Sequence, residues 1–132
     1  MSVVAIDAAK EEVGKWLDYK KIGDAKRESF KDSIETLAGY LSDGSLILRE
    51  DKTFEHTLKF AVGSGGSIAK LEYKPRISMK AVNEKMVGVK PTDADGRLLA
   101  YIAALTGQPK NIISELDTED NAVAQAIAVF FV

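Results

Sequence analysis

The feature that most constrains the fold is a pair of strand-like segments joined by a glycine-rich turn. Residues 53–62 alternate between apolar and polar side chains, which is the period of a half-buried strand. The turn Gly63-Ser64-Gly65-Gly66 has the permissive backbone of a hairpin, and residues 67–74 return as a partner strand before Pro75. We therefore predict an antiparallel hairpin over residues 53–74. The apolar side of its first strand consists of Phe54, His56, Leu58 and Phe60.

Helical patterns precede the hairpin. Apolar residues between Val13 and Tyr19 recur at intervals of three and four, which predicts a short amphipathic helix that ends near Gly23. A second helix is predicted to begin at Asp24, as its cap, and to end at Gly44, a residue type that is common at helix C-termini.

Helical patterns also follow the hairpin. Ser78 and Thr92 are the predicted caps of two helices, because their hydroxyl groups can accept a hydrogen bond from the first turn. Pro109 is placed like the first residue of a third, shorter helix. A final helix is predicted to begin after Asp117 or Thr118 as its cap.

These patterns predict an α+β fold. A small antiparallel sheet lies between N-terminal helices and a C-terminal bundle of short helices, which cover one of its faces. With 132 residues the chain has an ordinary size for one domain, and it contains no internal repeat or linker. We expect a single domain over residues 1–132, with a helical part (1–44), a β-rich middle (45–76) and a second helical part (77–132).

Composition excludes several classes of protein. The chain has 18 basic and 20 acidic residues, whereas proteins that bind polynucleotides owe much of their affinity to a basic excess. We therefore expect no nucleic acid as its main partner. The absence of cysteine excludes disulfides and zinc–thiolate sites.

The apolar runs are short. The longest covers residues 126–132, whereas a helix that spans a bilayer needs about 20 residues. The run at residues 3–6 has no basic leader before it and is interrupted by Asp7, unlike a signal peptide. We expect a soluble protein that makes no membrane contact and stays in the cytoplasm where it is made.

Catalytic patterns are weak. The only histidine, His56, falls on the apolar side of the predicted strand, where a lone histidine is more often structural than a base. No serine lies in a nucleophile-elbow sequence, and there is no cysteine for a Cys–His pair. The glycines at 63–66 join two strands instead of a strand and a helix, so they read as a hairpin tip and not as a phosphate loop. We predict no catalytic residue and no cofactor.

Acidic residues gather at two predicted helix starts, at Asp93 with Asp95 and at Asp117 with Glu119 and Asp120. Neither group has the alternating oxygen ligands and closing glutamate of a calcium loop. Helix capping and the helix dipole explain both groups, so we predict no metal site.

Helix-turn-helix DNA binding is the alternative that the helices at residues 78–87 and 93–105 raise. The second helix carries only Arg97 as a basic residue, beside Asp93 and Asp95, whereas a helix that reads DNA approaches phosphates and base edges. A small DNA-associated or regulatory binding module remains the alternative function. Binding that weakens steeply with salt would identify it.

Both ends of the sequence are apolar. Exposed apolar patches tend to mark sites for partners, but apolar termini can also dock on the core of the same chain. The sequence is compatible both with a partner interface and with docking on the core of the same chain. The candidates for a partner or self-association interface are Val3, Val4, Ile6, Phe130 and Phe131.

A family resemblance covers residues 54–132. It rests on the hairpin at residues 58–76, on a helix followed by Ala-Leu-Thr-Gly-Gln-Pro at residues 94–109, on Ile-Ile-Ser-Glu-Leu-Asp-Thr-Glu-Asp at 112–120, and on the closing run at 126–131. This pattern of apolar spacing and turn residues resembles the tail assembly chaperones of long-tailed, siphophage-type bacteriophages and prophages.

The resemblance implies a non-enzymatic late protein of virion morphogenesis, which acts in the host cytoplasm and is not part of the mature virion. It implies binding to the long, helical tape measure protein and to the tail tube protein that polymerises around it. It also implies a homo-oligomer, either a ring or a spiral, and in many members a longer form made by translational frameshifting. Repeated weak apolar contacts suit such a role.

Overall fold

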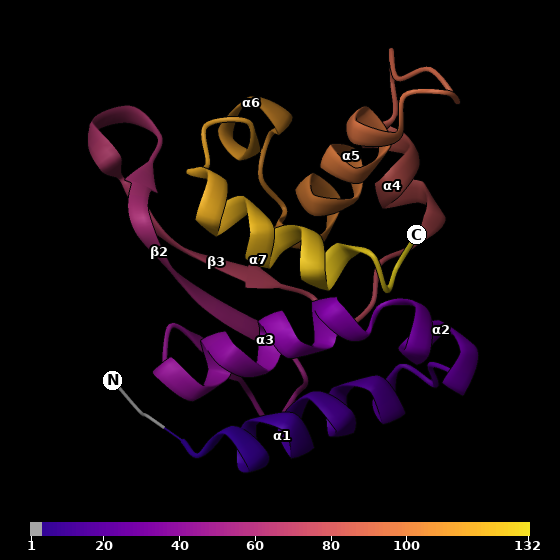
Figure 1. The fold of residues 1–132 in the computed structure, drawn as a ribbon. Coiled ribbons are helices and arrows are strands. Elements are labelled where there is room, and N and C mark those ends of the chain that lie inside the picture. The colour runs from indigo at the N-terminus through magenta and orange to yellow at the C-terminus, as the bar shows by residue number, and fades with distance from the viewer. Residues whose placement is uncertain (1–3) are drawn as a thin grey trace.

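The computed structural model describes residues 4–132 and has the α+β architecture that the sequence predicts (Figure 1). Helices precede and follow a three-stranded antiparallel sheet. In chain order the elements are α1 (Ile6–Tyr19), α2 (Asp24–Ser29), α3 (Lys31–Asp43), β1 (Leu46–Leu48), β2 (Phe54–Val62), the 3-10 turn η1 (Ser64–Gly66), β3 (Ile68–Tyr73), α4 (Met79–Lys85), α5 (Ala94–Thr106), α6 (Lys110–Ile113) and α7 (Thr118–Ala128).

The sheet has the order β1-β2-β3, so the predicted hairpin forms two of its three strands. Phe54 of β2 lies opposite both Leu48 and Tyr73, and the central strand is thereby paired on both sides. One face of the sheet is apolar and buried. The other face carries ion pairs between Arg49 and the carboxylates of Glu55 and Glu72.

The helices lie on the buried face and join into one body (Figure 1). α1 packs along α3, α3 contacts both β1 and α7, and α7 crosses β2. α5 packs on β3 and on α4, α6 and α7. None of the helices within residues 4–132 is both long and apolar enough to cross a membrane.

An aromatic cluster holds the two helical parts together. The Trp16 ring of α1 lies 4.9 Å from the Phe54 ring and 5.8 Å from the Phe130 ring, measured between ring centroids. The Phe130 ring also meets Phe30, with centroids 5.7 Å apart and the planes nearly perpendicular. Such edge-to-face pairs add to the stabilisation that comes from burial of the rings. Residues from both ends of the chain therefore share one core.

Three predicted helix starts are wrong in detail. Pro109 occupies the cap position of α6, which begins at Lys110 instead of at Pro109. The second predicted helix is two helices, because the backbone of Phe30 leaves the helical region at φ −114° and ψ 31°. Asp24 is the first helical residue there, and Gly23 occupies the cap position. Asp93 and not Thr92 caps α5, since its side chain accepts a hydrogen bond from the Gly96 N–H. An aspartate one residue nearer the helix competes better for the free N–H groups.

Other predicted turns and caps are confirmed. Gly44 and Gly107 end α3 and α5 in the left-handed conformation, with φ of 86° and 69°. Ser78 accepts a hydrogen bond from the Ala81 N–H at the start of α4. Asp117 accepts one from the Glu119 N–H at the start of α7.

The alternation of β2 breaks after Leu58. Thr57 pairs with Lys70 but Val62 pairs with Ile68, so residues 58–61 lie opposite the single residue Ala69. This bulge turns the strand, and Phe60 is exposed instead of lying on the apolar side as predicted. The prediction was wrong at Phe60 alone, since Val62, which is in phase with Leu58, is buried again at the end of the bulge.

Candidate functional site

Three polar side chains meet inside the core, between the sheet and α7. His56 is 1% exposed and Asp120 is 2% exposed, and the Tyr73 side chain is also fully buried. His56 Nδ1 lies 3.0 Å from Tyr73 Oη, which is hydrogen-bond distance. His56 Nε2 lies 3.6 Å from Asp120 Oδ1, which is an electrostatic contact and too long for a hydrogen bond.

Asp120 anchors the bulge of β2. Its Oδ1 accepts a hydrogen bond from the Lys59 N–H, with N and O 3.0 Å apart, and its Oδ2 accepts one from the Phe60 N–H at 3.2 Å. The bulge would otherwise leave these two N–H groups without a partner from β3, and an unpaired buried N–H is costly. Asp120 therefore has a structural role that the sequence analysis missed, because it treated the residue only as a first-turn carboxylate.

The environment keeps His56 neutral. Burial lowers the pKa of His56 below its ordinary value of 6.5, and the Asp120 carboxylate opposes this shift. A carboxylate that faces Nε2 favours the tautomer with the proton on Nε2, and Nδ1 then accepts a hydrogen bond that the Tyr73 hydroxyl donates. Burial also raises the pKa of Tyr73. The geometry fits a packed polar link between β2, β3 and α7.

Within residues 4–132 no three histidine or carboxylate side chains lie close enough together to hold a metal ion. The three acidic residues at the start of α7 make different contacts. Asp117 caps the helix, Glu119 pairs with Lys59, and Asp120 enters the core.

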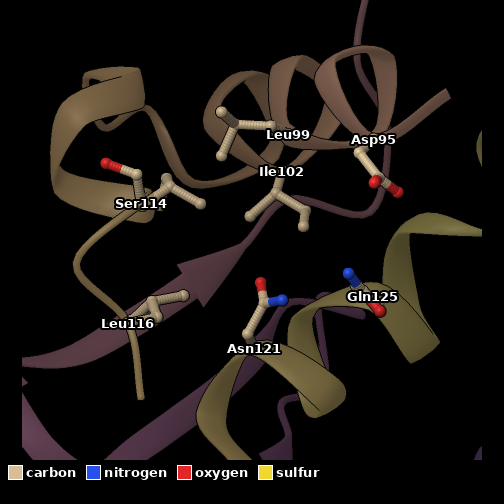
Figure 2. A pocket seen from close by; sticks show the side chains of 8 residues that line it. Asp95, Leu99, Ile102, Ser114, Leu116, Asn121 and Gln125 are labelled. Atoms are coloured by element: carbon tan, nitrogen blue, oxygen red, sulfur yellow. The ribbon is translucent and has the colours of Figure 1, made fainter. Parts of the chain in front are cut away.

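An open groove lies between α5, α6 and α7 and has a volume of about 350 Å³. Figure 2 shows side chains from all three of these regions around one hollow, with Leu99 and Ile102 on the α5 side. Leu116 extends the apolar surface from the segment that follows α6. The apolar side chains of the lining thus come from α5 and from the α6–α7 connection.

Polar groups line the remaining sides of this groove. Asn121 and Gln125 lie four residues apart on α7, so they lie on one side of that helix. Asp95 faces them from the first turn of α5, and Ser114 follows α6 (Figure 2). The groove thus combines apolar side chains with amides and one carboxylate, a surface that an amphipathic peptide can cover.

The predicted interface residues at the start of the chain have two outcomes. Val4 and Ile6 are exposed, with 38% and 46% of their surface accessible. Ile47 of β1 lies beside Val4, and both line a small apolar hollow of about 170 Å³. Val3 lies outside the described residues.

The predicted interface residues at the end of the chain lie against the protein itself. Phe130 is 2% exposed and belongs to the core. It therefore docks on its own chain and offers no surface to a partner. Phe131 is half-buried, with its ring 6.0 Å from the Trp16 ring and the Lys20 Nζ 3.5 Å from its centroid. The Lys20 ammonium over this ring is a cation–π contact.

A second hollow, of about 270 Å³, borders Phe131. Lys20 and Arg76 contribute its cations, and Ile77 and Met79 contribute apolar surface. Met79 is 67% exposed although it is a large apolar residue. This site could not be predicted from the sequence, because residues 20 and 76 come together only in the folded chain.

Comparison with known proteins adds no relative: no family model, no curated protein and no solved structure matches the chain.

Proposed function

We propose that this protein is a non-enzymatic phage tail assembly chaperone that self-associates and binds the tape measure protein. The observation that carries the proposal is the pattern of residues 94–131, which resembles that family and which forms the helices around the groove of α5, α6 and α7. The remaining expectations of the resemblance belong to the same proposal: contact with the tail tube protein, action in the host cytoplasm and absence from the mature virion.

The groove is the proposed site for the tape measure protein. A long helical protein can lay an apolar side chain against Leu99 and Leu116, while its neighbouring polar groups bond to Asn121 and Gln125. Asp95 favours a lysine or arginine next to that apolar residue. The groove is shallow and mixed in character, which suits many weak contacts along one helix better than a single tight one.

Co-expression with the tape measure protein of the same phage tests the proposal. The tape measure protein alone should precipitate, and it should stay soluble and co-elute with this chain on a sizing column. An unrelated protein of similar size serves as the control. If the tape measure protein precipitates equally in both cases, the chaperone proposal is wrong.

A variant locates the contact. Leu99→Glu places a charge on the apolar side of the groove, and we expect co-elution to be lost while the circular dichroism spectrum stays unchanged. Val87→Glu, at an exposed valine that does not line the groove, is the matched control. Loss of co-elution in both variants, or in neither, would exclude the groove as the site.

A further inference from the structure

Two cations, Lys20 and Arg76, line the hollow beside Phe131, and the charge of Lys26 lies near Lys20. Lys20 Nζ donates a hydrogen bond to the Pro75 carbonyl oxygen at 3.3 Å and Lys26 Nζ donates one to the Val132 carbonyl oxygen at 3.2 Å. Arg76 lines the same hollow and is exposed. We call the surface formed by Lys20, Arg76, Ile77, Met79 and Phe131 the basic pocket.

The basic pocket lacks anions of its own. Among the described residues, no aspartate or glutamate lies within 4.0 Å of the Lys20 or Arg76 nitrogens, whereas the nearby Arg27 pairs with Asp18 at 2.7 Å and Lys26 bonds to the main-chain oxygen of Val132. Burial, with the charges of Lys26 and Arg76, lowers the pKa of Lys20 from 10.5 to about 8. A cluster of like charges beside exposed apolar surface is stabilised by a ligand that brings carboxylates and apolar side chains together.

The start of α1 has this chemistry. Val4 and Ile6 are exposed apolar residues, and Asp7 and Glu11 are exposed carboxylates one helical turn apart on the same side of the helix. Residues 4–12 contain three acidic residues and one lysine, Lys10. We call the surface formed by Val4, Ile6, Asp7 and Glu11 the acidic start.

The two surfaces lie at opposite ends of the molecule. The acidic start is at the first turn of α1, and Lys20 follows directly after its last residue, Tyr19. The 14 residues of α1 give a helix about 21 Å long. Figure 1 shows the N mark at one side of the molecule, and the C mark with α2 and α4 at the other. One copy therefore cannot fill its own basic pocket with its own acidic start.

We propose that the acidic start of one copy docks in the basic pocket of the next copy. Val4 and Ile6 meet the apolar side chains of Ile77 and Met79, and the carboxylates of Asp7 and Glu11 face the cations of Lys20 and Arg76 on the neighbour. The charge complementarity of the two surfaces selects a second copy of this chain as the occupant.

The contact joins two different surfaces, so it is heterologous. Such contacts generate a closed ring when the rotation between copies closes and an open helical filament when it does not. The inference rests on the self-association in the proposed function, for which it supplies the interface and its direction. It does not depend on binding of the tape measure protein.

Charge reversal at each end tests the contact in the full chain. Lys20→Glu with Arg76→Glu reverses the basic pocket, and Asp7→Lys with Glu11→Lys reverses the acidic start. We expect each double variant alone to be monomeric at concentrations where the wild type associates, a loss of at least tenfold in association constant. An equimolar mixture of the two should regain the wild-type mass, because both contacts become complementary again. Light scattering behind a sizing column measures each mass.

The controls separate misfolding from loss of the contact. Lys20 bonds to Pro75 and lies on Phe131, so its replacement can disturb folding. Arg76→Glu with Met79→Ser changes only exposed residues of the basic pocket and should also be monomeric. Lys52→Glu with Lys90→Glu has the same charge change as the double reversal, at residues that lie outside both surfaces, and should associate like the wild type.

Each other outcome overturns the inference. If the reversed variants associate as the wild type does, the interface lies elsewhere, while the proposed function is untouched. If they are monomeric but the mixture stays monomeric, the two surfaces do not meet. If the wild type is monomeric and its basic pocket instead binds a DNA duplex, the occupant is nucleic acid. Co-elution with the tape measure protein would still decide the chaperone proposal separately.

Discussion

The two ends of α1 carry similar apolar side chains in opposite situations. At its C-terminal end, the rings of Phe130 and Phe131 pack against Trp16 in the last turn of the helix. Phe130 belongs to the core, and Phe131 is partly buried against it. At its N-terminal end, Val4 and Ile6 remain exposed. The two ends differ in the residues that cover them. The rings of Trp16 and Phe30 pack against Phe130, whereas the Val4 side chain lies in an open hollow beside Leu41 and Ile47.

The electrostatic environment of the two ends differs in the same way. Lys20 and Arg76, which have no aspartate or glutamate partner among the described residues, lie at the aromatic end, and the carboxylates of Asp7 and Glu11 lie at the exposed aliphatic end. An apolar residue near a chain end therefore does not by itself identify an interface. The pattern of charge around it, and the rings available to cover it, decide between core and surface.

The largest effect is expected at the buried end. Phe130→Ser should lower the free energy of unfolding by about 3–5 kcal/mol, because it removes a ring from a packed core and leaves a cavity with a hydroxyl in it. Ile6→Ser should change it by less than about 0.5 kcal/mol, since the side chain is already exposed. Urea unfolding followed by circular dichroism gives both values. Equal effects at the two positions would contradict the difference in burial between the two ends.

The next effect is expected on association at the exposed end. Val4→Ser with Ile6→Ser should weaken self-association at least tenfold, about 1.4 kcal/mol, and should leave the urea midpoint in place. Phe60→Ser with Val87→Ser removes two exposed apolar residues that lie on neither surface, and should have no effect on association. Sedimentation at several concentrations measures this. If the control pair weakens association instead, the interface is at the hairpin or at the loop after α4.

A third prediction separates core stability from association. His56→Gln replaces a buried ring and should lower the free energy of unfolding at pH 7.5 by about 1–2 kcal/mol. Self-association should be unchanged, because His56 lies on neither surface. This is the reverse of the outcome expected for Val4 and Ile6. A large loss of association in a folded His56→Gln protein would contradict the assignment of the interface.

The same variant tests the protonation of His56. Its pKa in the folded protein is below 6.5, so the unfolded chain binds the proton first as the pH falls. The wild type should therefore lose stability as the pH drops through 6.5, by at most about 1.4 kcal/mol per pH unit from this residue. His56→Gln should lose less stability than the wild type between pH 7.5 and 5.5, because the replacement removes the group whose pKa burial lowers. Equal losses would mean that the histidine is charged inside the core.

The smallest effect is expected from Lys20. Its pKa of about 8 reflects burial and the neighbouring charges of Lys26 and Arg76. The ammonium form is the one that attracts carboxylates, so self-association should be strongest below pH 8 and should weaken a few-fold as the pH rises through it. Lys20→Met should remove this dependence. A wild-type association constant that is flat from pH 7 to 9.5 would exclude Lys20 from the contact.

Local chemistry made much of the fold predictable. The hairpin, its glycine turn, the caps at Ser78 and Asp117 and the helix end at Gly44 each depend on residues within a few positions of one another. The α+β class followed from the same short-range patterns.

Tertiary partners explain what could not be predicted. Phe60 is exposed because Asp120, sixty residues later, holds the bulge of β2 by its backbone N–H groups. The basic pocket joins Lys20 to a segment fifty-five residues away. The burial of Phe130 depends on Trp16 and Phe30. None of these pairings leaves a pattern in the sequence near either partner.

In the proposed contact, copies of this chain join end to end, with the acidic start of one copy in the basic pocket of the next. The most direct test is the mass of the wild-type protein in solution, measured by light scattering over a hundredfold range of concentration at low and at high salt. We expect a mass that rises with concentration, or a large defined oligomer, with weaker association at high salt because salt screens the charges. A monomer at every concentration and salt would contradict it.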